Sequence, residues 1–117
     1  MLYTSYFGNI RNLPEELAVV SISTIPIKGW SGYQYRKLAP KAEWISLAKN
    51  GRTEEYKRLY MEMINCLDTD VVIEELYDLT DSEDIVLVCY ERPENFCHRH
   101  LVSEWFRNAG YECEEFK

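Results

Sequence analysis

The chain has 117 residues, 46% of them hydrophobic and 28% charged, which is typical of one soluble globular domain spanning residues 1–117. Its formal net charge of −7 argues against bulk binding to nucleic acid or to an anionic membrane. We find neither a signal peptide nor an apolar run approaching the ~20 residues of a membrane span. With four cysteines, we therefore expect a cytoplasmic protein with free thiols, and disulfide pairing remains the alternative.

The first third of the chain predicts two short strands and two loops. Pro14 suits the first position of a helical turn, and Pro26 ends the second strand. Two glycines among polar and aromatic residues indicate a loop with turns before Pro40. In chain order, these elements are a strand at 2–4, a loop at 5–12, a helical turn at 13–16, a strand at 17–24 and a loop at 27–40.

The rest of the chain predicts four helices and two strands. Residues 85–90 form a continuous apolar run, typical of a central strand that is covered on both faces. Gly110 ends the last helix, whose first turn lies near residues 95–98 with Asn95 as its N-cap. The expected helices are 40–49, 54–67, 68–79 and about 96–109, and a weak edge strand follows at 111–116.

This order of elements predicts an α/β fold, namely a small Rossmann-like three-layer domain with a mostly parallel sheet of about four strands. In such sheets, ligands bind beyond the carboxyl ends of the strands. The chain has neither a G-x-G-x-x-G nor a P-loop motif, so the usual signals for dinucleotide or nucleoside triphosphate binding are missing. We therefore predict no cofactor.

Cys97, His98 and Arg99 follow the central strand at the predicted start of the last helix. A thiol at a helix N-terminus, beside an arginine and histidines, is expected to have a lowered pKa. Cys97 is therefore the candidate nucleophile, His98 the candidate proton carrier, and Arg99 the candidate clamp for a phosphate or carboxylate. The alternatives are a structural cysteine and capping or surface histidines.

Further residues are expected to line the same pocket. They come from the end of the first strand, from the loop after the second strand and from the stretch around Cys97: Ser5, Asn9, Arg11, Lys28, Trp30, Cys89, Glu91 and His100. The alternative interpretation of Cys89 is a small core residue. The alternative for the loop that carries Lys28 is a solvated surface loop. The eight-residue step from Cys89 to Cys97 matches no usual zinc spacing, so we predict no metal site.

Two stretches resemble the family called domain of unknown function 488. The first reads Cys89-Tyr90-Glu91-Arg92-Pro93, then Cys97-His98-Arg99-His100-Leu101 and Glu104-Trp105. The second pairs Tyr3-Thr4-Ser5 with Asn9-Ile10-Arg11 and the segment from Val19 to Pro26. The resemblance implies a compact α/β domain with its site at Cys-His-Arg, and it says little about the substrate.

One departure concerns the end of the second strand. Many members resemble Asp-Val-Arg-Ser-x-Pro there, whereas this chain reads Ser21-Ile22-Ser23-Thr24-Ile25-Pro26. The charged pair that would form a second anion clamp is missing.

Three classes of function follow from these observations, one expected and two alternative. The chain is expected to be an enzyme acting on a small anionic molecule, nucleotide-like or phosphorylated, at the helix that starts with Cys97-His98-Arg99. The alternatives are a non-catalytic protein that sequesters or senses such a ligand, and a structural or partner-binding domain. The sequence indicates no oligomeric state.

Overall fold

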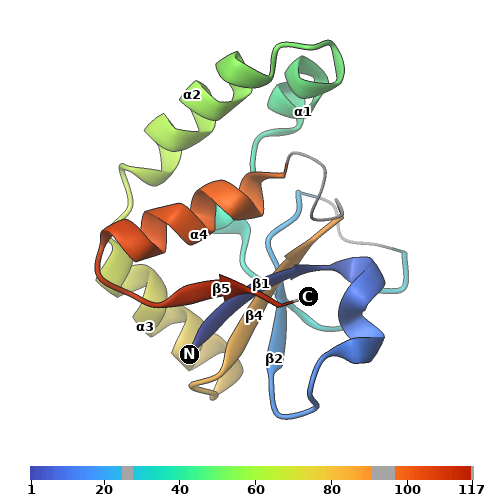
Figure 1. The fold of residues 1–117 in the computed structure, drawn as a ribbon, viewed down its shortest axis with the longest axis vertical. Helices are drawn as coiled ribbons and strands as arrows, with labels where there is room; N and C mark the ends of the chain where they lie inside the picture. Colours follow the sequence, from blue (N-terminus) through green and yellow to red (C-terminus); the bar gives the residue numbers. More distant parts are fainter. Residues whose placement is uncertain (25–27, 91–96, 117) are drawn as a thin grey trace.

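The computed structural model describes residues 1–24, 28–90 and 97–116. Within these residues, five parallel strands form one sheet in the order β3-β2-β4-β1-β5 (Figure 1). This arrangement confirms the Rossmann-like α/β prediction, with one strand more than the expected four. The strands are β1 (Leu2–Tyr6), β2 (Ala18–Ser21), β3 (Tyr33–Gln34), β4 (Ile85–Cys89) and β5 (Cys113–Glu115).

The central strand is β4, as its unbroken apolar run predicts. All five of its residues are fully buried, and it pairs with β1 on one side and β2 on the other. Successive side chains point to opposite faces of the sheet. Ile85, Leu87 and Cys89 therefore join the large hydrophobic cluster on one face, while Val86 and Val88 join Phe7 on the other.

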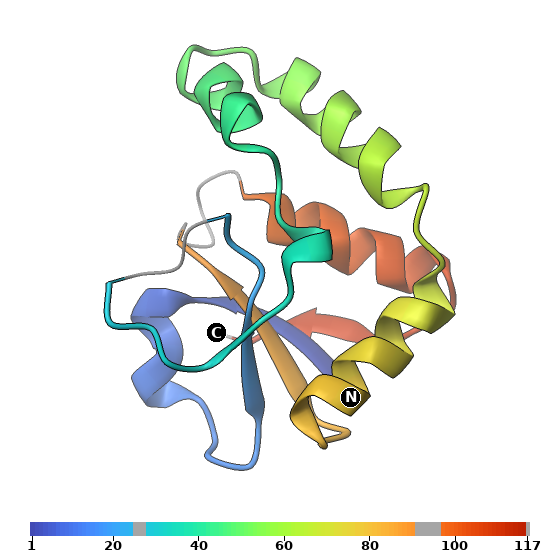
Figure 2. The same cartoon turned by 180° about the vertical axis from the view of Figure 1, so that it is seen from behind.

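The two faces have different covers. The described helices are α1 (Ala42–Lys49), α2 (Thr53–Ile64), α3 (Thr69–Thr80) and α4 (His98–Asn108), with 3-10 helices η1 (Phe7–Asn12) and η2 (Arg36–Leu38). Figures 1 and 2 show α3 and α4 on one side of the sheet and η1 on the other. Residues of α2, α3 and α4 build the large cluster. The opposite face is covered by η1 and loop side chains, so its layer is thinner than predicted.

Local details differ from the sequence expectations in two places. The helical turn expected at residues 13–16 is only a hydrogen-bonded turn, whereas η1 lies in the predicted loop 5–12. Two-residue β3 lies in the predicted loop 27–40. From the sequence, either Asp68 or Asp70 is expected to cap α3, and the structure shows that Asp68 does, because its side chain accepts hydrogen bonds from the backbone amides of Asp70 and Val71. The N-cap expected at Asn95 lies outside the described residues.

The strand order creates one position suited to a ligand. From β2 the chain passes to β3 at one edge, whereas from β4 it crosses β1 to reach β5 at the other edge. Adjacent strands whose connections leave in opposite directions form a topological switch point, and ligands of open α/β sheets bind there, beyond the carboxyl ends of the strands. In this chain, that position lies where β2 and β4 end. No described helix is long and apolar enough to cross a membrane.

Candidate functional site

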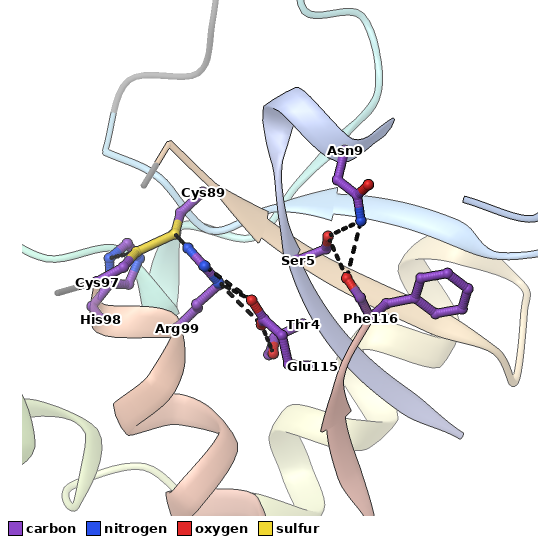
Figure 3. A network of polar contacts seen from close by, with 9 residues as sticks. All are labelled: Thr4, Ser5, Asn9, Cys89, Cys97, His98, Arg99, Glu115 and Phe116. Carbon is purple, nitrogen blue, oxygen red and sulfur yellow. Dashed lines mark hydrogen bonds and ion pairs between the residues drawn. A yellow bond between two sulfur atoms is a disulfide. The ribbon is translucent and has the colours of Figure 1, made fainter. Parts of the chain in front are cut away.

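Two cysteines meet at the end of the central strand. Cys89 is the last residue of β4 and Cys97 is the N-cap of α4, and both are buried. A disulfide joins them, with their Cα atoms 7.5 Å apart (Figure 3). The expectation of free thiols is therefore wrong for this pair in the form described by the structure, and it holds for Cys66 and Cys113. The fold brings together residues from a strand end and a helix start, which spacing alone leaves undetermined.

His98 lies beside the sulfur of Cys97. Its Nδ1 is 3.7 Å from Cys97 Sγ, and its Nε2 is 2.7 Å from the carbonyl oxygen of Ile22. Because a carbonyl oxygen only accepts hydrogen bonds, Nε2 carries the proton and Nδ1 presents its lone pair towards the sulfur. Burial lowers the pKa of His98 to about 4, so the ring is neutral near pH 7.

Arg99 points to the opposite side of the helix start and is fully buried. Its Nε donates to both carboxylate oxygens of Glu115 at 3.1 and 3.2 Å, and Nη2 donates at 3.0 Å. Thr4 Oγ1 donates to the same carboxylate at 2.6 Å. Nη1 donates to Cys89 Sγ at 3.2 Å, and the guanidinium carbon lies 5.8 Å from the centroid of the Tyr6 ring. The guanidinium thus holds β5 and the sulfur of Cys89, a geometry that favours a positioning role over the predicted clamp on a ligand.

A cavity of about 670 Å³ lies at the switch point. Cys89, Cys97 and His98 form part of its wall, whereas Arg99 does not line it. The other lining residues come from the segment after β2, the segment before α1, the facing helices α1 and α2, and the residue after β4: Ser23, Thr24, Pro40, Ala42, Ile45, Ala48, Lys49, Thr53, Tyr56 and Tyr90. The start of α4 therefore adjoins a hollow at the edge of the sheet.

Two polar groups in this wall were missed from the sequence. Ser23 is 3% exposed, and its Oγ has no hydrogen-bond partner among the residues that the structure describes. Lys49, in the last turn of α1, adds a positive charge to a largely apolar lining. The sequence signal for Ser23 is its place near the carboxyl end of the predicted strand 17–24, where ligands of open α/β sheets bind. The position of α1 as the facing wall depends on long-range packing and has no local signal.

Ser5 and Asn9 lie elsewhere. Asn9 Nδ2 donates to Ser5 Oγ at 3.1 Å and to the carbonyl oxygen of Phe116 at 3.0 Å. Ser5 Oγ donates to the same carbonyl at 3.0 Å, so the pair fastens β1 to the C-terminal segment (Figure 3). Neither side chain lines the cavity. The cavity wall therefore gives no support to the predicted contacts of Ser5 and Asn9 with a ligand.

The remaining predicted residues are also outside the cavity wall. Arg11 and Lys28 are exposed on the surface. His100 is half-buried in the first turn of α4, two residues after His98, and does not line the cavity. Trp30 packs edge-on against Phe7 with ring centroids 5.3 Å apart, on the face of the sheet opposite α4. Glu91 lies outside the described residues.

Cys89, Cys97 and His98 also form a group of metal-ligand side chains. One ligand atom from each lies within 4.8 Å of the others, and all three residues are buried. Among the described residues, this is the one such group of three or more. The sequence prediction of no metal site rested on the cysteine spacing. The fold places His98 beside the pair, which the cysteine spacing does not reveal.

A family model described as "Active DUF488-N3 subclade" matches residues 5–110. The matched range contains β4, the start of α4 and every residue that lines the cavity. No curated protein and no solved structure matches the chain.

Proposed function

The chain belongs to the DUF488 family, within its DUF488-N3 subclade, and we propose that it binds a small anionic molecule in the switch-point cavity and acts on it with the Cys89–Cys97–His98 cluster. One observation carries this proposal. Two sulfur atoms and an imidazole form part of the wall of a cavity whose position in the sheet is the usual ligand position of open α/β folds.

An anionic ligand is favoured by three features of the wall. Helix α4 directs its N-terminus, with its partial positive charge, to this end of the sheet. Ser23 supplies a buried hydroxyl that lacks a partner within the described chain, and such groups normally have one. Lys49 supplies a full positive charge. Together these groups fit a phosphate or a carboxylate.

The rest of the wall suits an apolar or planar body. Pro40, Ala42, Ile45 and Ala48 present aliphatic surface, and Tyr56 presents a ring. The volume of about 670 Å³ lies within the range of small-molecule sites, about 300–1,000 Å³. A nucleotide-like molecule has both an anionic group and a planar ring. The cavity therefore supports the nucleotide-like class over a bare inorganic anion.

The reactive cluster needs its dithiol form for sulfur chemistry. A disulfide contains no thiolate, and the thiolate is the nucleophile and the metal ligand. The predicted nucleophilic role of Cys97 applies only after reduction and stays a prediction. Arg99 is retained as a positioning residue, because its guanidinium contacts Cys89 Sγ from within the core.

The test is binding of adenosine monophosphate, as a nucleotide probe, to the reduced protein by isothermal titration calorimetry. We expect Ser23→Ala and Lys49→Ala each to weaken binding at least about tenfold, since a hydrogen bond to a charged group contributes roughly 1.5–3 kcal/mol. Ser23→Ala should not lower the stability of the fold, because its hydroxyl has no described partner to lose. Lys28→Ala is the matched control, with the same loss of charge outside the cavity wall.

Binding that is equal in Ser23→Ala, Lys49→Ala and Lys28→Ala would refute the placement of the ligand. A second measurement addresses catalysis. The non-catalytic alternative is favoured if both the wild type and Cys97→Ser bind the probe and neither protein converts the probe or any other nucleotide tested. Conversion by the wild type that is lost in Cys97→Ser supports an enzyme.

A further inference from the structure

We propose that Cys89, Cys97 and His98 of the reduced protein bind a zinc ion whose fourth coordination position opens into the cavity. This inference deepens the proposed function, on which it rests for the ligand, by naming the metal with which the site would act.

One of the donor distances already fits a tetrahedral zinc ion. With Zn–S near 2.3 Å and Zn–N near 2.0–2.1 Å, a sulfur and a nitrogen on the same ion lie about 3.6 Å apart. Cys97 Sγ and His98 Nδ1 are 3.7 Å apart in this structure. Two zinc-bound sulfurs lie about 3.8 Å apart, so the sulfurs of Cys89 and Cys97 must separate after reduction.

The backbone leaves room for that separation. The Cα atoms of Cys89 and Cys97 are 7.5 Å apart, above the usual ~4.4–6.8 Å for bonded cysteines. Both cysteines are fixed at their backbones, one at the end of β4 and the other at the start of α4. Side-chain movement alone therefore suffices to open the sulfur pair while the fold stays in place.

The surroundings of two donors resemble the outer shell of a metal site. Metal-bound histidines almost always donate their second ring N–H to a carbonyl, carboxylate or water, which fixes the ring. His98 makes this contact, because Nε2–H donates to the carbonyl oxygen of Ile22 at 2.7 Å and leaves Nδ1 available. Arg99 Nη1 donates to Cys89 Sγ at 3.2 Å, a contact that stabilises negative charge on sulfur.

The number of ligands indicates an open site. Structural zinc ions have four protein ligands, whereas catalytic ones have three, including the Cys₂His set, and leave the fourth position to water or substrate. Among the described residues, the cluster comprises two cysteines and one histidine. All three also line the cavity, so the fourth position faces the space in which we place the ligand. A zinc ion there would polarise an oxygen of the ligand or a bound water.

The oxidised and zinc-bound forms exclude each other. Breaking the disulfide takes two electrons and two protons, which a phosphine and water supply as the phosphine becomes its oxide. Zinc binding then releases the two thiol protons. The oxidised protein is therefore a control with the same sequence, a joined sulfur pair and no site.

The experiment titrates phosphine-reduced, metal-free protein with Co²⁺ as a spectroscopic probe and then with Zn²⁺. We expect one Co²⁺ per chain, with sulfur-to-cobalt charge-transfer absorption and tetrahedral d–d bands that Zn²⁺ abolishes. Cys89→Ser, Cys97→Ser and His98→Ala should each weaken binding by more than the roughly 10–100-fold that loss of an outer-shell partner costs. Cys66→Ser removes an exposed free thiol elsewhere and should leave the titration unchanged.

Circular dichroism checks that each variant is folded, and the oxidised wild type, which should bind no cobalt, tests the site without any substitution. The proposal is overturned if the reduced wild type binds neither metal, or if the cobalt spectrum persists in Cys89→Ser and Cys97→Ser. Probe binding that depends on Ser23 in a protein that binds no metal would remove the zinc inference alone. Zinc binding without any nucleotide binding would remove the proposed ligand alone.

Discussion

The buried ion pair of Arg99 and Glu115 provides a quantitative test of how α4 is held. Three nitrogens of the guanidinium donate hydrogen bonds, Nε and Nη2 to the carboxylate of Glu115 and Nη1 to the sulfur of Cys89. The side chain of Arg99 is 0% exposed, and that of Glu115 is 16% exposed. Glu115→Gln keeps the shape of the side chain and removes its charge. The guanidinium then remains in the core without its counter-charge, and an amide N–H₂ faces its donors.

The expected cost follows from this burial. Removing one partner of a buried ion pair costs about 3–5 kcal/mol, and the partial exposure of Glu115 places this change near the lower end, about 3 kcal/mol. The total stability of a domain is about 5–15 kcal/mol, so the loss should be a large fraction of it. Urea unfolding of the oxidised proteins at pH 7 measures the change as a lower midpoint at a similar m-value.

Two controls give this prediction its specificity. Glu62→Gln breaks the surface pair with Arg58, whose side chains are 59% and 63% exposed, and should cost no more than about 0.5 kcal/mol. The double variant Arg99→Met with Glu115→Leu removes both charges and should lose less than Glu115→Gln alone. If Glu115→Gln is as stable as Glu62→Gln, the guanidinium is not sealed in the core and its assignment as a positioning residue fails.

Three further predictions concern the helices and the free thiols. Asp68→Ala removes the side-chain cap of α3 and should cost about 1 kcal/mol in urea unfolding; no change would contradict the cap. The hydrogen bond from Lys37 lowers the pKa of Glu75, so its stabilising effect is present above the unfolded pKa near 4.5 and is lost as pH falls. Glu75→Gln should therefore be less stable than the wild type in urea unfolding at pH 7, and the difference should shrink as the pH is lowered; a difference that is the same at pH 7 and at acidic pH would refute this. Burial raises the pKa of Cys113, so iodoacetamide should label exposed Cys66 first in the folded protein, as mass spectrometry would show; equal rates would refute this.

Elements with strong local signals were predicted well from the sequence. The apolar run of β4 and the repeating apolar stripe of α4 are local patterns that require no knowledge of distant contacts. Gly110 follows α4 with a φ of 95°, a backbone conformation that glycine adopts without steric cost. These signals were sufficient for the fold class and for the location of the sulfur cluster.

Other features depend on contacts that local patterns do not encode. The two residues of β3 form a strand because they pair with Val20 and Ser21, which lie within the predicted strand 17–24. Residues 7–12 lack an apolar stripe at helical spacing, yet they form η1. Phe7 of η1 packs against Val86 and Val88 on the face of the sheet opposite α4. The wall of the cavity opposite the cluster is α1, whose place is set by tertiary packing. Secondary-structure propensity is a weak guide wherever such packing decides the outcome.

The role of Arg99 shows how the phase of a helix divides a sequence motif. Successive residues of an α-helix are rotated by about 100°, so His98 and Arg99 diverge although they are adjacent in the chain. Arg99 shares its spacing with Val102 and Phe106, at i+3 and i+7, and all three are fully buried. That spacing places Arg99 on a buried face, but it does not set His98 apart, because His98 stands four and seven residues before Val102 and Trp105, which are also buried. The contacts of the two side chains distinguish them: His98 contacts Ile22 and Cys97, whereas Arg99 contacts Glu115 and Cys89. The motif that reads Cys-His-Arg therefore separates in space into a cavity-facing group of Cys89, Cys97 and His98 and an arginine that supports it from behind.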